Sequence, residues 1–411
     1  MEFKEMKEFK PFTEMLSRCY PMMELTTAED KEEAAKHRER TSQYETVTPM
    51  GVYEEGTLKA GYIHYMFPMN VYGQTMPSTG VGTLAVDLPY KKQGLAKQMI
   101  SYAIEKSRNE GFPLIQLYPF RPDFYRKMGF GFGPQLNVFR FSPYQAPSFT
   151  DAAPVVSLGK EDVEEIKRCY HDWAEDTHGA CDKQDYEFSH IAMDYTHTIG
   201  CRIDGKLQGY AVYEMKHHHD FTHDLKVIDW FTNSNEAFQA IINFLHLQKD
   251  QVSTIIFPTF DDDFAFMLND PRHDANRLIH RIYHQTHERG TGLMYRIIDV
   301  PLFMEYIRDH SFRPQTNAAI NFDITDSLLK KKEIFSYQFK NGRPEYSDTP
   351  LSHGVTLALS IDDLSSLLMG AVSLKKLLSY NKASASGNEE ELKKAVHLFN
   401  EPEKPVSWTF F

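Results

Sequence analysis

Cysteine is scarce in this 411-residue sequence: Cys19, Cys169, Cys181 and Cys201 are the four present, and no two share a Cys-x-x-Cys spacing. The pattern therefore predicts neither a disulfide framework nor a zinc site. Long apolar runs are also missing, since none approaches the roughly 18 residues that a membrane-spanning helix requires. The charged opening segment, MEFKEMKEFKPF, lacks the apolar stretch of a secretory signal. We therefore expect a cytoplasmic protein with reduced thiols, no bound metal and no membrane contact.

Positive charge is in deficit, because 45 Lys and Arg residues face 57 Asp and Glu residues, which gives a formal net charge of −12 at pH 7. This balance argues against nucleic acid as the main partner and mildly favours cationic substrates. A content of 41% hydrophobic and 25% charged residues is typical of a globular protein. At roughly 150 residues per domain, the length predicts two or three domains.

The first 149 residues indicate a mixed domain in which strands and helices alternate. Two helices precede the strands and are broken at Pro21, because proline cannot continue a helix. Apolar residues recur at helical spacing through 94–111, which predicts a helix that ends at Gly111. The remaining expected elements are strands at 51–73, 76–88 and 113–120, a helical turn at 122–132 and a closing strand at 137–143.

Near residue 150 a stretch rich in Pro, Ser and Ala indicates a linker. The next region repeats the coarse order of the first without its glycine-containing turn, which is consistent with a second copy of the fold that has no cofactor loop. A third pattern follows, with strands expected at 317–326, 333–342 and 354–362 before helices at 363–380 and 389–400. The expected organisation is therefore three domains, at 1–149, 150–290 and 291–411.

The segment LAVDLPYKKQGLAKQM, residues 84–99, leads from an apolar strand through a glycine-centred turn into an amphipathic helix. Such a turn directs free backbone N–H groups and the positive end of the helix dipole at one point, which suits a phosphate group. Gly94 would let a ligand approach the backbone, and Ala96 keeps the first turn narrow. Lys91 and Lys92 stand beside the expected anion. An ordinary strand-to-helix turn with solvated lysines is the alternative.

The run Lys91-Lys92-Gln93-Gly94-Leu95-Ala96 resembles the Arg/Gln-x-x-Gly-x-Gly/Ala signature with which GNAT-family acetyltransferases hold the pyrophosphate of acetyl-CoA. Lys91 stands where that signature usually has Arg or Gln. The segment FYRKMGFGFGP, residues 124–134, resembles the family's Tyr-x-x-x-Gly-Phe/Tyr-Gly element. Over its whole length, the chain resembles the enhanced-intracellular-survival (Eis) type of acetyltransferase, which ends with a sterol-carrier-like domain and an aromatic C-terminus.

This resemblance implies two tandem GNAT folds, each a mixed and mostly antiparallel sheet with flanking helices, followed by a sterol-carrier-like α+β domain. It also implies acetyl-CoA as cosubstrate, an amine acceptor such as an aminoglycoside-like polycation or a lysine side chain, and a homo-oligomer, commonly a hexamer. The cofactor-binding residues that it implies are Leu84, Ala85 and Val86 for the pantetheine arm, through their backbone, and Lys91, Lys92, Gln93, Gly94, Leu95 and Ala96 for the pyrophosphate.

Acetyl transfer needs a proton for the departing thiolate, and a tyrosine hydroxyl can donate one at neutral pH. Tyr125 occupies the position of the family's catalytic tyrosine, which implies that role; core packing beside Phe124 is the alternative. The family inserts its C-terminal carboxylate into the active site. The resemblance therefore implies that the carboxylate of Phe411 is the base, anchored by the rings of Trp408, Phe410 and Phe411. A terminal strand that packs on its own domain is the alternative.

Three other features have ordinary explanations. The run KHHHDFTHD, residues 216–224, could suggest a metal site. Successive residues of a strand point to opposite faces, so three consecutive histidines could not all face one metal ion. We therefore expect a solvated loop within a hairpin. Asp261 to Asp263 fit a polar loop. The third domain could hold a lipid. Its pattern of apolar residues, however, is no more than a buried strand and an amphipathic helix require. The competing function is a binding protein that holds CoA or a lipid without turnover.

Overall fold

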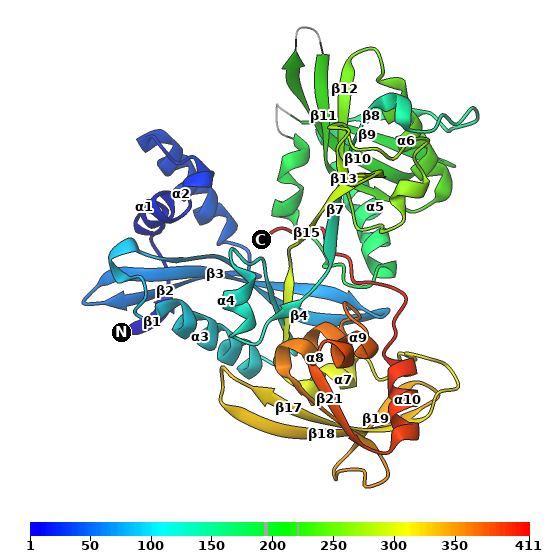
Figure 1. The fold of residues 1–411 in the computed structure, drawn as a ribbon. Helices are drawn as coiled ribbons and strands as arrows, with labels where there is room; N and C mark the ends of the chain where they lie inside the picture. Colours follow the sequence, from blue (N-terminus) through cyan, green and yellow to red (C-terminus); the bar gives the residue numbers. More distant parts are fainter. Residues whose placement is uncertain (193–195, 220–221) are drawn as a thin grey trace. The chain divides into compact units, whose positions relative to one another are not determined.

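A computed structural model describes residues 1–192, 196–219 and 222–411 of the chain (Figure 1). The chain divides into two compact units. The first contains Met1–Gly133, Leu293–Pro405 and Phe411, and the second contains Pro134–Gly292 and Val406–Phe410. Each unit therefore combines segments that are far apart in the sequence. Within the described residues, no helix is both long and apolar enough to cross a membrane.

The first unit contains a seven-stranded sheet in the order β1-β2-β3-β4-β5-β16-β6. Neighbouring strands are antiparallel except for β4 and β5, which are parallel. Strands β3 and β4 form a long hairpin whose turn contains Tyr72 and Gly73, both at positive φ. The strands are β1 (Glu2–Glu5), β2 (Val47–Glu54), β3 (Thr57–Val71), β4 (Gln74–Val86), β5 (Leu114–Leu117), β6 (Gly131–Phe132) and β16 (Met294–Ile297).

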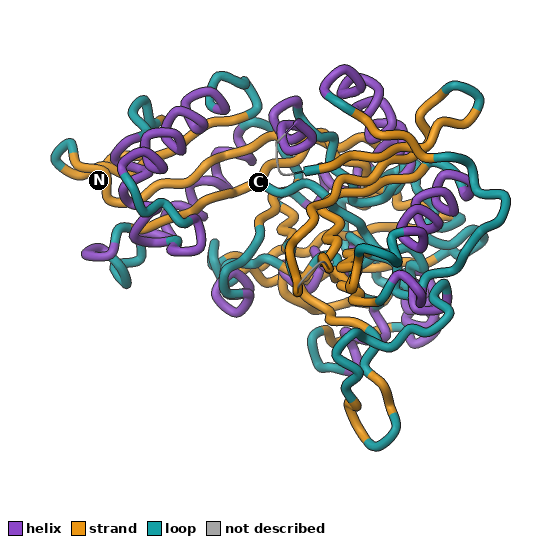
Figure 2. The backbone as a smooth tube through the Cα atoms, turned by 90° about the horizontal axis from the view of Figure 1, so that it is seen from above, coloured by secondary structure: helices purple, strands orange, loops and turns teal. Residues whose placement is uncertain are grey.

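Helices cover both faces of this sheet, as Figures 1 and 2 show. They are α1 (Lys10–Cys19) and α2 (Ala28–Thr41) on one face, and α3 (Leu95–Asn109) and α4 (Pro122–Arg126) on the other. A Cβ added to Gly61 would lie 2.9 Å from the Phe12 ring of α1, whereas the next residue, Tyr62, packs into the apolar cluster beneath α3. The predicted break at Pro21 is confirmed, since Pro21–Met23 form a short 3-10 turn between α1 and α2.

The third region of the chain also lies in the first unit and adds a second sheet in the order β19-β18-β17-β20-β21. Its strands are β17 (Ala318–Asp326), β18 (Lys331–Lys340), β19 (Arg343–Ser347), β20 (Val355–Ser360) and β21 (Ala383–Gly387). Its helices are α7 (Val300–Tyr306), α8 (Ile361–Leu368), α9 (Leu374–Ser379) and α10 (Glu389–Leu398). The helix expected at 363–380 is in fact two helices. Gly370, at φ +69, ends the first, because a left-handed residue cannot continue a helix.

The second unit contains a seven-stranded sheet in the order β15-β7-β12-β11-β10-β9-β8. Its strands are β7 (Gln135–Phe141), β8 (Val155–Leu158), β9 (His197–Ile203), β10 (Lys206–His219), β11 (Thr222–Thr232), β12 (Val252–Thr259) and β15 (His287–Thr291), with a separate hairpin of β13 (Leu278–His280) and β14 (Tyr283–His284). The helices α5 (Val163–Asp176) and α6 (Asn235–Leu247) pack against this sheet.

Two strands belong to sheets that the sequence order does not suggest. The strand expected to close the first sheet, at 137–143, is β7, and it pairs with β12 and β15 in the second sheet. Strand β16, which follows the second region in sequence, pairs instead with β5 and β6 in the first sheet. The expectation that 137–143 closes the first domain was therefore wrong. Alternating apolar residues identify a strand but carry no information about its partner.

Candidate functional site

The candidate site begins where β4 separates from β5. The two strands pair through Ser78–Val81 and Leu114–Leu117, and β4 then continues alone on that side, within the described residues, to Val86. A bulge accompanies the separation: Ile63 of β3 faces Gly82 and Gly61 faces Ala85, so between these pairs two residues of β4 lie opposite one residue of β3. Thr83 in this bulge has φ +50. Bulges of this kind redirect backbone groups. Here the bulge leaves backbone polar groups of β4 facing the space that opens between β4 and β5.

A pocket of about 740 Å³ opens at this gap. Of the nine residues that the sequence predicts to hold a cosubstrate, eight line the pocket, namely Leu84, Ala85, Val86, Lys91, Lys92, Gly94, Leu95 and Ala96. Gln93 is absent from the lining, and its side-chain amide lies 3.4 Å from the Pro89 carbonyl, to which it donates. The end of β4 and the start of α3, which are close in the sequence, therefore line one pocket in the structure.

The start of α3 supplies the anion-binding part of this pocket. Gly94 precedes the helix with φ +83, and no side chain within the described residues caps the free N–H groups of the first turn. Lys91 and Lys92 are exposed beside it. Uncapped N–H groups, the helix dipole and two ammonium groups together favour a phosphate or pyrophosphate. An acyl-CoA would fit here with its pyrophosphate at Gly94 and its pantetheine amides along β4.

Two side chains at the end of α1 contact the free edge of β4. The Tyr20 hydroxyl donates a hydrogen bond to the Leu84 carbonyl at 2.5 Å, and the Cys19 thiol donates to the Val86 carbonyl at 3.3 Å. Burial raises the pKa of Tyr20 to about 12 and also raises the pKa of Cys19, so both remain protonated donors at neutral pH. Sequence reasoning missed both residues, because their partners lie more than sixty positions away in the chain.

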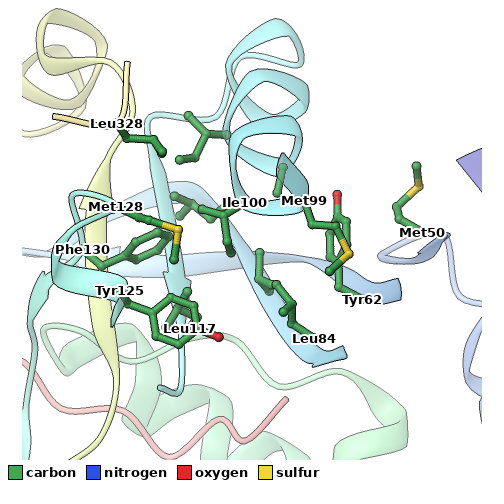
Figure 3. Packing of buried hydrophobic residues seen from close by; sticks show 14 of the residues in the cluster. Met50, Tyr62, Leu84, Met99, Ile100, Leu117, Tyr125, Met128, Phe130 and Leu328 are labelled. Atoms are coloured by element: carbon green, nitrogen blue, oxygen red, sulfur yellow. The ribbon is translucent and has the colours of Figure 1, made fainter. Parts of the chain in front are cut away.

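Tyr125 lies in α4, at the margin of the core cluster of the first unit (Figure 3). Its ring contacts Phe124 and Phe120 edge to face, with centroids 5.2 and 5.7 Å apart, and both of those residues line the pocket. In Figure 3 its hydroxyl points away from Met128 and Phe130. Burial, with a smaller contribution from Tyr20, raises the pKa of the Tyr125 hydroxyl well above its ordinary value. It is therefore protonated throughout the neutral range.

The residue after Tyr125 fixes α4 in place. The Arg126 guanidinium donates to Asp362 at 2.6 and 2.9 Å and to Asp363 at 2.7 Å, and both aspartates are buried at the start of α8. Their carboxylates hold the guanidinium in a charge-assisted network. The third region of the chain thus holds the helix that carries Tyr125.

The glycines that follow Tyr125 are required by close contacts with the same region. A Cβ on Gly129, which has φ +83, would lie 1.6 Å from the Arg296 guanidinium, and one on Gly131 would lie 2.0 Å from the Asp362 carbonyl. Arg296 is buried, donates to the Met128 carbonyl at 2.8 Å and pairs with Asp326. The Tyr-x-x-x-Gly-Phe-Gly element therefore has glycines where neighbouring backbone and a buried arginine leave no room for a side chain.

Phe411 occupies a slot on β4. A Cβ on Gly80 would lie 2.7 Å from the Phe411 ring, and one on Gly82 would lie 2.8 Å from the Phe411 carboxyl carbon. The ring also contacts Phe67 and Tyr65 of β3 and Tyr118, at centroid distances of 4.9, 5.5 and 5.6 Å. Two glycines on one face of the strand thus form the floor, and three aromatic rings form the walls. Sequence reasoning did not identify Gly80, Gly82 and Tyr118, although glycines spaced two apart in a strand were a usable signal.

The preceding residues belong to the second unit, where Trp408 is buried. Its ring contacts Phe260 and Phe231 at centroid distances of 5.2 and 6.0 Å, and the Val406 N–H donates to the His178 carbonyl at 2.9 Å. Phe410, which the sequence assigned to the apolar anchor, is instead 60% exposed. Of that trio, Trp408 is therefore buried and Phe411 is partly buried.

In the part of the chain that the structure describes, no group of three or more His, Cys, Asp or Glu side chains is placed to hold a metal ion. The histidine run lies in the hairpin of β10 and β11, but the expectation of a solvated loop was wrong for most of it, because His217 pairs with His223 in the ladder of these two strands. Asp220 and the side chains of His218 and His219 lie outside the described residues. In the other acidic stretch, Asp262 pairs with Arg289 at 3.0 Å.

Comparison with protein families assigns these regions. Residues 4–133 and 166–297 match models of the acetyltransferase (GNAT) domain, and residues 303–408 match the sterol carrier protein domain. The two GNAT matches together cover more than half of the sequence. The chain belongs to the GNAT acetyltransferases. Membership implies an acyl-CoA cosubstrate and an amine acceptor, and the third match confirms the expected sterol-carrier-like domain.

Solved structures share this three-domain fold over the whole of this chain. A GCN5-related N-acetyltransferase from Anabaena variabilis has a TM-score of 0.81 at 20% identity, with both chains covered fully. A probable N-acyltransferase from Enterococcus faecalis gives 0.80 at 17% identity, with 99% of its chain covered. Eis1 from Mycobacterium abscessus gives 0.76 at 16% identity, with both chains covered fully. At these identities the likeness shows the fold, which is that of Eis1. A search of curated proteins found no match.

Proposed function

We propose that this GNAT acetyltransferase transfers an acetyl group from acetyl-CoA to a primary amine by direct attack, and that the reaction takes place in the first GNAT domain. The observation that carries the proposal is the uncapped start of α3 at Gly94, which opens into a pocket lined by the end of β4.

The amine nitrogen attacks the thioester carbonyl carbon, and the resulting tetrahedral intermediate expels the thiolate of CoA. Tyr125 donates a proton, or a hydrogen bond, to that sulfur as its charge develops, which is worth about 10²- to 10⁴-fold in rate. The carboxylate of Phe411 accepts the proton that the acceptor's ammonium group must lose before its nitrogen can attack. A terminal carboxyl is a weak base in water, and such a group becomes a stronger base when it is removed from water.

The acceptor is an amine that is cationic before it reacts, either a polycation such as an aminoglycoside or a lysine side chain. The slot around Phe411 supports this class, because the rings of Tyr65, Phe67 and Tyr118 pack around the ring of the residue that carries the carboxylate. Aromatic faces attract cations within about 6 Å of the ring centroid. The carboxylate adds direct charge attraction.

The test is acetyl-CoA turnover, followed as released free thiol, against a panel of aminoglycosides, polyamines and lysine peptides. Intact-mass measurement identifies any acetylated product and verifies that the protein ends at Phe411. We expect product from at least one cationic amine. Adding one glycine after Phe411 should abolish most turnover without altering acetyl-CoA affinity. Binding of acetyl-CoA without consumption of any amine would contradict the enzyme proposal and favour a binding protein.

A further inference from the structure

Three consecutive residues at the end of α1 are attached to the end of β4. The Arg18 guanidinium donates to both oxygens of the Asp87 carboxylate at 2.9 Å. The next two side chains, Cys19 and Tyr20, donate to two backbone carbonyls of β4. We call these three side chains the latch. Their partners occur in the reverse order along β4, so the end of α1 runs beside the strand as an antiparallel neighbour would.

The two carbonyls that the latch occupies face the side of β4 from which β5 has separated. The Asp87 N–H donates to the Lys59 carbonyl of β3 at 3.0 Å. Because backbone groups of successive strand residues point to opposite sides, the Val86 carbonyl points away from β3, and so does that of Leu84. The pantetheine arm of an acyl-CoA contains two amide N–H groups, which need such acceptors when the arm aligns with a strand. The latch therefore uses the acceptors that the cosubstrate needs.

The segment after the latch is free of core packing, whereas the body of α1 is not. Pro21 and Met22 are exposed and Met23 is partly buried, with Met22 85% exposed. Phe12 and Leu16 of α1 are fully buried, which anchors the helix against the sheet. The thiol of the latch is a weak donor, and a neutral hydrogen bond contributes only modestly to stability. A ligand that makes the same bonds to β4 therefore displaces the two side chains at small cost.

We propose, on the basis of the function proposed above, that Cys19 and Tyr20 close the pantetheine site of the free protein and that the cosubstrate opens it by replacing them on β4. The latch keeps the polar edge of the strand paired while the pocket is empty. The pair of Arg18 with Asp87 persists and acts as the hinge. Only molecules with an open latch bind the cosubstrate, so the apparent affinity is lowered by the fraction in which the latch is closed.

Calorimetric titration of the full-length protein with acetyl-CoA tests this proposal. Tyr20→Phe removes the hydroxyl of the latch and keeps the ring. We expect it to bind acetyl-CoA about two- to tenfold more tightly than the wild type, a factor that corresponds to the net contribution of one hydrogen bond. Its melting temperature without ligand should be lower, because the Leu84 carbonyl loses its donor. A merely structural role for Tyr20 would lower stability and affinity together, so opposite signs identify the latch.

The matched control is Tyr62→Phe in β3, whose buried hydroxyl has no partner in the described chain. It should leave acetyl-CoA affinity unchanged. Hydrogen exchange supplies a second readout, because the N–H groups of Met23 and Glu24 bond within the turn that follows the latch, at 3.0 and 3.1 Å. Acetyl-CoA should slow exchange at the start of α3 and speed it at these two residues.

Two outcomes would overturn the latch and leave the proposed function intact. One is an acetyl-CoA affinity that Tyr20→Phe weakens or leaves unchanged. The other is exchange that acetyl-CoA slows at Met23 and Glu24 as well as at α3, since the cosubstrate would then bind over a segment that stays in place. A wild-type protein that binds no acetyl-CoA would contradict the proposed function and the latch with it.

Discussion

The two GNAT domains differ at the start of the helix that follows their long strands. In the first domain α3 begins after Gly94, and within the described residues no side chain caps its N–H groups. In the second domain α6 begins after Ser234, whose hydroxyl accepts from the Ala237 N–H at 3.1 Å. A helix that caps itself has fewer free donors for a ligand. Under the proposed function, one residue at the cap thus separates the turn that binds the cosubstrate from a structural turn.

The strand ends differ as well. In the first domain the end of β4 lines an open pocket. In the second domain Trp408 packs against Phe231, near the end of β11, and against Phe260, just after β12. The second domain therefore contains a segment of its own chain at the strand ends. The two copies of the fold therefore differ: the first has an open pocket at its strand ends, where we propose that the cosubstrate binds, and the second holds the segment that contains Trp408.

The largest expected effect concerns Tyr125. Tyr125→Phe should lower kcat about 10²- to 10⁴-fold, because the departing thiolate loses its proton donor. Acetyl-CoA affinity, measured by calorimetry, should stay within a factor of about three, since the ring still packs. The matched control is Tyr210→Phe in the second domain, whose buried hydroxyl has no partner in the described chain. An equal loss of rate in both variants would remove the special role of Tyr125.

Gly82→Ala should have the next largest effect. The new Cβ would lie 2.8 Å from the Phe411 carboxyl carbon and from the Tyr65 ring, so the carboxylate must move. A displacement of about 1 Å costs roughly 100-fold in rate, and we expect the loss in kcat with little change in acetyl-CoA affinity. Gly290→Ala, on the edge strand of the second unit, adds a Cβ that meets no atom within 4 Å. Steady-state kinetics of the two variants should differ; matching rates would exclude the slot as a positioning device.

The two helix starts can be compared directly by Gly94→Ala and Ser234→Ala. At Gly94 the φ of +83 strains any side chain, and the turn that presents the N–H groups shifts, so acetyl-CoA affinity should fall about tenfold. Ser234→Ala should leave that affinity unchanged and lower the free energy of unfolding by about 1 kcal/mol. Calorimetry and denaturant titration measure both quantities. The account would be wrong if the affinity fell in Ser234→Ala instead.

The smallest effect is a difference in pH dependence between the units. Burial raises the pKa of Glu187 in the second unit to about 7, so the folded state retains a proton that the unfolded state loses above about pH 4.5. Its stability contribution is complete below that pH and is lost as pH rises through 7. Burial lowers the pKa of His64 in the first unit to about 3, so stability falls as pH drops below about 6.5.

The opposite pH trends in the stability of the two units can be measured separately. Trp173, Trp230 and Trp408 all belong to the second unit, so tryptophan fluorescence reports on its unfolding. Hydrogen exchange of β3 and β4 reports on the first unit. From pH 5 to pH 7 the second unit should lose stability and the first should gain it. Glu187→Gln should remove the trend of the second unit, and a trend that persists would assign it to another group.

Local signals were sufficient for part of this site. The glycine turn at Gly94 and the tyrosine element at Tyr125 each depend on residues within a few positions, so their spacing identified them. The slot for Phe411 depends on glycines more than three hundred positions away, and the Tyr20–Leu84 hydrogen bond also joins distant segments. Whether β7 and β16 belong to the first or the second sheet depends only on which strands they pair with. Contacts of this kind leave no periodic pattern in a sequence.

The most direct test of the comparison is calorimetric titration of the full-length protein with acetyl-CoA, which counts binding sites per chain. We expect one site, with an affinity that Gly94→Ala weakens and Ser234→Ala leaves intact. Two sites per chain would show that the second domain also binds the cosubstrate. The account would be contradicted by a single site whose affinity falls in Ser234→Ala but not in Gly94→Ala, because acetyl-CoA would then bind to the second domain.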